Sequence, residues 1–352
     1  PKAAISFIGG KASISSEDCV SCGLCQKVCP YHAIVYTPVP CEDVCPVKAI
    51  SKDAEGVEHI DKEKCIYCGK CMQACPYGAI MERSKIIDIH KSISNPKKKI
   101  VAIPAPAIYG QFNATPGQVL AAIKQIGFDD VIEVALGAEI TAANEAKELE
   151  EKMQEGQAFM TTSCCPAYTG WVDKHAPMLK PYVSETRSPM VYAARYAKEK
   201  YPDAKVVFIG PCVAKRKEAQ RDEAVDFVMT FEEVASVLDG LDIQLEQSQP
   251  YTMSFASVRE AHGFAQAGGV MGAVKAYLKE EADKINAIQV ANLDKKTIGS
   301  LRAYAKSGKA PGQFIEVMAC EGGCITGPCT HNEIAAGKRQ FVQELAKQEK
   351  TY

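Results

Sequence analysis

The spacing of cysteines constrains this chain more than any other feature of its sequence. Sixteen of its 352 residues are cysteine; ten lie between Cys19 and Cys75, and the other six fall in three later segments. Disulfide scaffolds place a higher fraction of cysteine in much shorter chains, and ordinary cytosolic enzymes contain far fewer cysteines. The clustering therefore predicts that most of these side chains bind metal rather than one another.

Two segments repeat one ligand spacing, Cys-x2-Cys-x2-Cys-x3-Cys-Pro. They contain Cys19, Cys22, Cys25 and Cys29 in the first run, and Cys65, Cys68, Cys71 and Cys75 in the second. Bacterial ferredoxins have this spacing: three close thiolates hold one [4Fe–4S] cluster and the fourth cysteine binds the other cluster. We therefore expect Cys75 to complete the first cluster and Cys29 to complete the second. Zinc prefers separated cysteine pairs, or cysteine with histidine, and fits two full runs poorly.

A third, incomplete run lies between these two. Cys41 and Cys45 are separated by three residues and Cys45 is followed by proline, but the first two cysteines of a run are missing. Two interpretations stay open: both cysteines are free or structural thiols, or Cys45 replaces Cys29 as the distant ligand. Paired clusters carry single electrons, so this region is expected to act as an electron relay.

The change in cysteine density divides the chain. We expect a small α+β, ferredoxin-like domain over residues 1–95, ending in a linker, and a larger domain over residues 96–352. In the larger domain, apolar strand patterns at 99–106 and 129–136 alternate with helical patterns at 116–127 and 139–155. Strands that alternate with helices predict an α/β fold with a largely parallel sheet, in which ligands gather at the carboxyl ends of the strands.

Charge and hydropathy exclude two classes of partner. The formal net charge is −2, and hydrophobic residues make up 47% of the chain. This balance allows a sizeable core but gives no basic surface for nucleic acid or an anionic membrane. No apolar stretch approaches the ~18 residues of a transmembrane helix, and no signal peptide is visible at the start. We therefore expect a cytoplasmic protein.

The remaining cysteines lie in three segments of the larger domain, each directly after an apolar run. The segments read TTSCCPAY at 161–168, GPCVAK at 210–215 and EVMACEGGCITGPC at 316–329. If the preceding runs are parallel strands, the three loops meet at one edge of the sheet and bring at least four thiolates together. A third [4Fe–4S] cluster is the simplest interpretation, but an electron relay would not need so large a domain.

These segments resemble the signatures of the [FeFe]-hydrogenases, the iron-only hydrogenases: TSCCP, PCxxK and ExMACxxGCxxG. The resemblance covers the whole chain and implies a two-lobed catalytic H domain behind a two-cluster ferredoxin-like domain. It also implies an H-cluster, in which a [4Fe–4S] cluster is joined by a cysteine sulfur to a two-iron unit with CO, cyanide and a bridging dithiolate. Dedicated maturation proteins would supply the two-iron unit. By this resemblance, the cluster ligands are Cys165, Cys212, Cys320 and Cys324, with Cys324 as the bridge.

The resemblance also assigns roles beside the two-iron unit. Cys164 matches the proton-donating thiol, whose tunable pKa suits proton transfer; otherwise it is a small buried hydrophobic residue. Lys215 matches the lysine that pairs with a cyanide ligand; otherwise it belongs to the charged surface stretch that follows it. Met318 matches a methionine packed against the two-iron unit, or else it fills the core.

A proton route is implied in the same way. Glu145 and Glu148 are three residues apart and share a helical face, which is commonly a solvated surface. The resemblance places both, together with Ser184, at the positions of the family's proton channel. Cys164, Glu145, Ser184 and Glu148, with bound water, are then expected to carry protons between iron and solvent.

Several positions depart from the best-known members of the family. Pro328 and Cys329 interrupt a glycine run, Gly210 takes the place of a methionine, and Ala167 follows TSCCP where glycine is usual. These differences resemble the subgroup often called group B. No role is assigned to Cys329 or to the nearby His331.

The sequence therefore favours an enzyme that catalyses 2 H⁺ + 2 e⁻ ⇌ H₂ and exchanges electrons with a ferredoxin or similar one-electron carrier. Two alternatives come from the same family. Iron–sulfur assembly factors share the domain but lack the two-iron unit, and the presence of Cys164, Lys215 and the channel carboxylates argues against that class. A hydrogen sensor would use the same cofactor at low turnover, but no kinase or similar signalling extension is visible.

Overall fold

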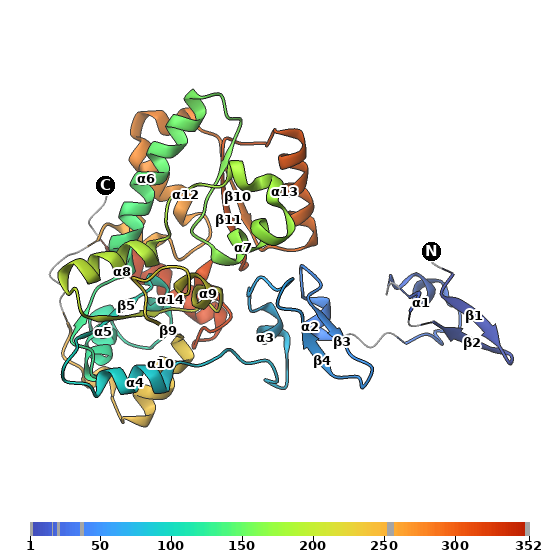
Figure 1. The fold of residues 1–352 in the computed structure, drawn as a ribbon, viewed down its shortest axis with the longest axis horizontal. Helices are drawn as coiled ribbons and strands as arrows, with labels where there is room; N and C mark the ends of the chain where they lie inside the picture. The colour runs from blue at the N-terminus through green and yellow to red at the C-terminus, as the bar shows by residue number, and fades with distance from the viewer. Residues whose placement is uncertain (1–2, 16, 20–21, 36–38, 252–256, 349–352) are drawn as a thin grey trace.

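The cysteine-rich region consists of two small units. The computed structural model describes residues 3–15, 17–19, 22–35, 39–251 and 257–348. The first unit, residues 3–35, contains an antiparallel hairpin and a helix: β1 (Ile5–Ile8), β2 (Lys11–Ile14) and α1 (Leu24–Val28). The second unit, residues 39–81, contains two helices and an antiparallel pair of strands: α2 (Pro40–Asp43), β3 (Ile50–Lys52), β4 (Glu58–Ile60) and α3 (Lys70–Ala74). In Figure 1 the second unit lies beside the large body of the protein, whereas the first unit lies apart.

One turn occurs three times in these units, once after each Cys-Pro pair. In each copy, the residue three positions after the cysteine has a positive φ and donates its N–H to the cysteine carbonyl, with an N–O distance of 3.3 Å. The pairs are His32 with Cys29, Lys48 with Cys45, and Gly78 with Cys75. The repeat in the sequence therefore encodes a repeated backbone shape, and the incomplete run shares it.

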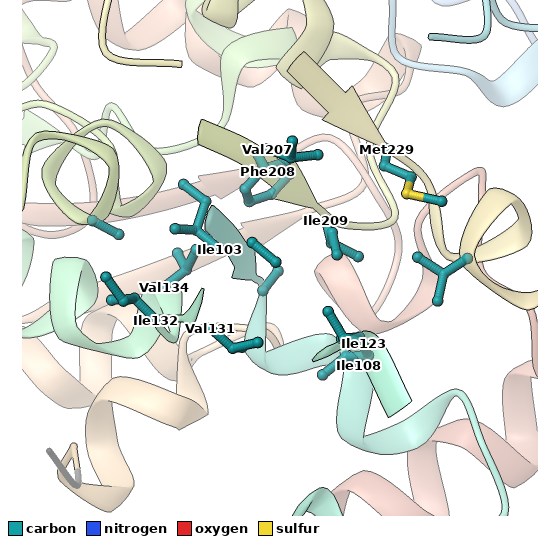
Figure 2. Close-up of a cluster of buried hydrophobic side chains, with 14 of the residues drawn as sticks. Ile103, Ile108, Ile123, Val131, Ile132, Val134, Val207, Phe208, Ile209 and Met229 are labelled. Carbon is teal, nitrogen blue, oxygen red and sulfur yellow. The ribbon is translucent and has the colours of Figure 1, made fainter. Parts of the chain in front are cut away.

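A parallel sheet of four strands forms the centre of one lobe of the large body. Its order is β6-β5-β8-β9, with β5 (Ile100–Pro104), β6 (Asp130–Val131), β8 (Lys205–Ile209) and β9 (Phe227–Met229). Strand β5 is buried along its whole length, and Ile103 is paired with Phe208 of β8 in the core seen in Figure 2. The helices of this lobe are α4 (Ile86–Ile93), α5 (Pro116–Gln125), α8 (Pro189–Lys200), α9 (Ala214–Ala219), α10 (Phe231–Gly240) and α14 (Ile334–Ala346).

A second parallel sheet, with the order β10-β11-β7, forms the centre of the other lobe. Its strands are β7 (Met160–Thr161), β10 (Ala287–Ala291) and β11 (Phe314–Met318). The helices here are α6 (Val134–Gln154), α7 (Pro166–His175), α11 (Arg259–Gly263), α12 (Gly269–Leu278) and α13 (Lys295–Ser307). Helix α6 packs against α8 of the first lobe and α12 of the second. The two parallel sheets confirm the predicted α/β fold.

Short 3-10 helices connect several of these elements. They are η1 (Pro106–Gly110), η2 (Pro177–Tyr182), η3 (Leu245–Gln247), η4 (Lys279–Lys284) and η5 (Cys324–Thr326). Among the described helices, none is long and apolar enough to cross a membrane.

In the large body, one local prediction of a helix is confirmed and one prediction of a strand is largely wrong. The expected helix at 116–127 is α5, which Thr115 caps. The expected strand at 129–136 is wrong beyond Val131, because α6 already begins at Val134. A short apolar run that is fully buried does not distinguish a strand from the first turns of a buried helix.

The connection between the cysteine-rich region and the large body is partly helical. The linker expected at 91–99 includes the end of α4, and the first strand of the sheet, β5, begins soon after it. The division of the chain at residue 95 stays a prediction.

Candidate functional site

Six cysteines line one cavity between the lobes, and four of them, from three loops, are those expected to bind the cluster. Cys320 interacts electrostatically with each of the other three, so the four sulfurs face a shared space. The structure thus brings together the cysteines expected to bind the cluster, near the carboxyl ends of β8 and β11 as parallel sheets favour. Their positions are Cys165 before α7, Cys212 after β8, Cys320 after β11, and Cys324 at the start of η5.

The cavity is a poor environment for free thiolates. Burial, together with neighbouring cysteines, raises the pKa of Cys212 to about 11 and the pKa of Cys324 to about 12. Cys324 keeps accessible surface, and that surface faces this cavity deep inside the protein. Thiols lose their protons when they bind iron, so a bound metal would have to offset the effect of burial.

The donor set fits an iron–sulfur cluster better than a single metal ion. In the described parts of the chain, no group of three or more His, Cys, Asp or Glu side chains is close enough to hold one ion. The cysteines of a four-iron cluster bind different irons, so they stand farther apart than the ligands of one zinc ion. Four thiols around a shared cavity meet that requirement.

Lys215 reaches the same cavity and is fixed there by hydrogen bonds. Its Nζ donates to Glu218 Oε2 at 2.6 Å and to Ser188 Oγ at 3.0 Å, and it lies 3.4 Å from the Cys164 carbonyl oxygen. Burial lowers the pKa of Lys215, but the Glu218 carboxylate more than offsets this, and the net pKa is raised. The side chain is therefore a buried cation, only 9% exposed, and not a surface lysine.

The Cys164 thiol lies beside this cation. Burial raises the pKa of Cys164 strongly, and Glu145 and Cys165 raise it further, while Lys215 opposes them. The thiol therefore keeps its proton at neutral pH. Met318 also lines the cavity and is buried, a position compatible with cofactor packing or with core filling.

A line of polar side chains leads away from Cys164. Glu145 is fully buried, and burial raises its pKa to about 8, although the Ser163 N–H donates to its Oε1 at 3.2 Å. Its Oε2 has no hydrogen-bond partner among the described residues, as suits a protonated carboxyl. Ser184 lies beside Glu145, and its Oγ donates to Glu148 Oε2 at 2.6 Å.

Glu148, at the outer end of this line, has the opposite protonation. Burial favours its neutral form, but Lys152 Nζ at 2.7 Å, Ser184 and the Glu185 N–H together lower the pKa of Glu148. At neutral pH, Glu145 is thus largely protonated and Glu148 ionised. Two carboxyls whose pKa values are pushed apart are typical of acid–base sites.

Sequence reasoning missed three of the supporting residues. Glu218 is three positions after Lys215, and Lys152 is four positions after Glu148, spacings that place each pair on one helical face. Glu316, fully buried in β11, accepts N–H groups from the start of α12 at 2.6 and 2.8 Å. A lone glutamate within the apolar run QFIEVMAC was the available signal for it.

A second cavity is lined by four cysteines of the second unit: Cys45, Cys65, Cys68 and Cys71. Cys45 interacts electrostatically with each of the other three. Burial raises the pKa of Cys68 to about 12, and burial with Cys65 and Cys45 raises the pKa of Cys71 to about 11. In both cavities, burial and neighbouring cysteines raise the pKa values of the lining thiols.

The structure places Cys29 and Cys75 in different units, and their expected exchange between the two runs stays a prediction. Cys29 ends α1, in the first unit with Cys19, Cys22 and Cys25, and α1 lies apart from α3 in Figure 1. Cys75 ends α3 but does not line the second cavity. Cys45 belongs to the same packed unit as the second run and lines this cavity with it.

The two cysteine cavities adjoin each other. Cys68 lines both cavities and interacts electrostatically with Cys320. Gly69 packs so closely on Pro328 that a Cβ at Gly69 would overlap its ring, and Gln73 Nε2 donates to the carbonyl before Pro328 at 3.2 Å. The proline that interrupts the family's glycine run is therefore a contact with the second unit.

Two adjacent four-cysteine cavities, one with a buried thiol, ammonium and carboxyl beside it, define an iron–sulfur redox protein. Residues 98–328 match the family model described as iron only hydrogenase large subunit, C-terminal domain. Residues 12–35 match a 4Fe-4S binding domain, and residues 35–86 match the LdpA Fe-S cluster-binding domain. The chain belongs to the iron-only hydrogenase family.

Relatives of known name include hydrogenases and assembly factors. The periplasmic [Fe] hydrogenase large subunit of Nitratidesulfovibrio vulgaris is 30% identical over an alignment that covers 89% of this chain and 85% of the relative. Iron hydrogenase 1 of Clostridium pasteurianum is 28% identical over 90% of this chain, which spans 64% of that relative's length. The cytosolic Fe-S cluster assembly factor narfl of Danio rerio is 23% identical over 70% of this chain and 75% of the relative.

Solved structures agree on the fold. A variant of [FeFe]-hydrogenase HydA1 from Chlamydomonas reinhardtii matches with a TM-score of 0.63 and 21% identity, covering 76% of this chain and 91% of that chain. The two-lobed α/β catalytic domain is thus the fold of [FeFe]-hydrogenases.

Proposed function

We propose that the protein is an [FeFe]-hydrogenase that catalyses 2 H⁺ + 2 e⁻ ⇌ H₂. The observation that carries this proposal is the meeting of Cys164 and Lys215 in the cavity lined by four cysteines. A cluster that only relays electrons needs neither a buried proton donor nor a buried cation beside it. Both groups suit a cofactor at which protons react and whose anionic ligands need a partner.

The residues of this cavity fit an H-cluster supplied in part by maturation proteins. When bound, its two-iron unit supplies the metal site at which protons and electrons combine or hydrogen is split. Lys215, held by Glu218 and Ser188, would present its ammonium to a cyanide ligand, and Met318 would pack beside the unit. The [4Fe–4S] part would be bound by Cys165, Cys212, Cys320 and Cys324, with Cys324 shared between the two parts.

Protons would move along the polar line that begins at Cys164. The raised pKa of Cys164 keeps its thiol protonated next to the metal. Glu145, with a pKa of about 8, can gain and lose a proton near neutral pH. Ser184 joins it to the ionised Glu148, which is half-buried and nearer to solvent. Bound water would bridge groups that do not touch.

Electrons would enter through the cysteine-rich region from a ferredoxin or similar one-electron carrier. Cys68 lines both cavities and interacts electrostatically with Cys320, which supports a direct electron-transfer step between clusters in the two cavities. We place the protein in the cytoplasm, although the relative from Nitratidesulfovibrio vulgaris is named as periplasmic.

Iron–sulfur assembly is the second candidate, because the Danio rerio assembly factor matches much of this chain. Such a protein would bind clusters without turning over hydrogen. Cys164 and Lys215 in the cavity, and Glu145 beside Cys164, would then have no function. The hydrogenase proposal accounts for all three.

Hydrogen production separates the two candidates. The chain would be produced anaerobically with maturation proteins and assayed with reduced ferredoxin, with hydrogen measured by gas chromatography. We expect turnover that the same chain lacks when it is produced without maturation proteins. Bound clusters without any hydrogen turnover, under conditions that activate a known hydrogenase, would favour the assembly role.

A further inference from the structure

We infer that Cys45, from the incomplete cysteine run, is the fourth ligand of a [4Fe–4S] cluster held by Cys65, Cys68 and Cys71. The inference deepens the proposed function and rests on it for the presence of an iron–sulfur relay. The ferredoxin spacing alone would give this place to Cys29. In the structure, the cysteine that lines the cavity beside the second run is Cys45.

The four sulfurs surround a cavity of about 550 Å³. Cys45 interacts electrostatically with all three cysteines of the second run, and Cys71 also interacts with Cys65. Among the described residues that line this cavity, these four are the cysteines. A four-iron cluster takes one thiolate on each iron, and this set meets that requirement.

A β-hairpin brings Cys45 to the second run. The chain between Cys45 and Cys65 folds back on itself as β3 and β4, in which residue 50 pairs with residue 60. Just outside that pair, the Asp61 N–H donates to the Ala49 carbonyl at 2.8 Å. Helices α2 and α3, on either side of the hairpin, also pack together. The two ends of the hairpin therefore meet, and the cysteines beyond them reach one cavity.

Local donors prepare the sulfurs to carry negative charge. The Ala49 N–H donates to Cys45 Sγ at 3.2 Å, and the Tyr67 N–H donates to Cys65 Sγ at 3.4 Å. Lys174, from the large body, donates from Nζ to the Cys65 carbonyl oxygen at 2.9 Å and places a cation nearby. Hydrogen bonds and nearby cations stabilise the thiolates that bind iron and tune the potential of a bound cluster.

The other Cys-Pro turns have the same shape but a different place. The Ala79 N–H donates to Cys75 Sγ at 3.4 Å, as Ala49 does to Cys45, yet Cys75 does not line the cavity. Cys29 lies at the end of α1, in the unit that stands apart from α3 in Figure 1. Each turn holds its cysteine sulfur in a similar way. The packing of the second unit places the sulfur of Cys45 at the cavity.

Iron content and electron paramagnetic resonance of variants test this assignment. The full chain would be produced anaerobically without maturation proteins, so that only [4Fe–4S] clusters form, and then reduced. Cys71→Ala identifies the signal of this cluster. We expect Cys45→Ala to lose the same signal, and the double variant to lose no more iron than either single variant. Cys29→Ala, the matched Cys-Pro control, should keep the signal.

A serine variant distinguishes the loss of a cluster ligand from misfolding of the alanine variant. Because a serine oxygen can bind iron, Cys45→Ser should keep this cluster but shift its signal and midpoint potential. An unshifted signal in Cys45→Ser, or loss of the Cys71-dependent signal in Cys29→Ala, would overturn the inference. None of these readouts involves hydrogen, so failure of the proposed hydrogenase activity would leave them unchanged and be recognised separately.

Discussion

The two cysteine cavities are each lined by four proposed cluster ligands but differ in what surrounds them. The cavity between the lobes adds Cys164 and the buried Lys215, whereas the cavity of the second unit is lined by exposed lysines such as Lys62 and Lys217. Four cysteines define where a cluster binds. The groups that hold or move a proton define where chemistry takes place, and Cys164 and Lys215 are such groups at the cavity between the lobes.

Removing the Cys164 thiol should have the largest effect. A positioned acid–base group contributes roughly 10²–10⁴-fold to rate, so we expect Cys164→Ala to lower hydrogen production by about that factor. The cofactor's infrared bands should remain. Cys329→Ala is the matched control, because Cys329 is fully buried but does not line the cavity. Equal turnover in both variants would remove Cys164 from the proposed route.

Interrupting the route one step farther out should have a smaller effect. Glu145→Gln keeps the shape of the side chain but cannot exchange a proton, so hydrogen production should fall by about 10²-fold, the lower end of the same range. Glu150→Gln, an exposed position on the same helix, should leave the rate unchanged. A wild-type rate in Glu145→Gln would show that protons take another path.

Glu145 should also make the stability of the fold depend on pH. Its pKa is about 8 in the folded protein against an ordinary value of 4.5, so the folded state binds the proton more tightly. The resulting stabilisation is complete below the unfolded pKa and is lost as the pH rises through 8. The melting temperature of Glu145→Gln should therefore rise relative to wild type as the pH rises from 4.5 to about 8, and the difference should level off above that. A constant difference would contradict the raised pKa.

The two ferredoxin runs can be compared at equivalent glycines, Gly23 and Gly69. Both have a positive φ, but a Cβ at Gly69 would overlap Pro328, whereas nothing lies within 4 Å of one at Gly23. Gly69→Ala should therefore destabilise the protein by roughly 1–3 kcal/mol more than Gly23→Ala, as measured by denaturant unfolding. Equal effects would mean that the second unit does not dock on the large body through this contact.

The smallest effect is expected from loosening Lys215. Glu218→Gln replaces an ion pair at 2.6 Å with a neutral hydrogen bond and should lower the free energy of unfolding by about 1 kcal/mol. Lys217→Gln, on the same helix but exposed, should change it less. If the two variants unfold alike, the pair with Glu218 does not hold Lys215 in place.

The meeting of three distant cysteine loops at one cavity could be predicted from the sequence. Cys165, Cys212 and Cys320 each follow an apolar run, and parallel strands bring such loops to one edge. The choice between Cys29 and Cys45 depends instead on how a hairpin closes and which unit packs on the rest. Cysteine spacing does not encode such long-range packing, and both possibilities stayed open at the level of sequence.

The ion-pair partners of the site residues were harder to predict than the cysteines that line the cavity. Glu218 and Lys152 could have been found from helical spacing, but only after their partners were known to be buried. The apolar run at 129–136 was misjudged because a buried strand and a buried helix start look alike in sequence. The burial of Glu145 and the hydrogen-bond partners of Glu148, which push the two pKa values in opposite directions, become visible only in the folded chain.

The most direct test of the central claim is the infrared spectrum of the chain matured anaerobically. If the cavity between the lobes holds a two-iron unit beside Cys164 and Lys215, CO and cyanide stretching bands should be present and should disappear in Cys324→Ala. A matured protein with its full complement of [4Fe–4S] iron but without these bands would contradict the account.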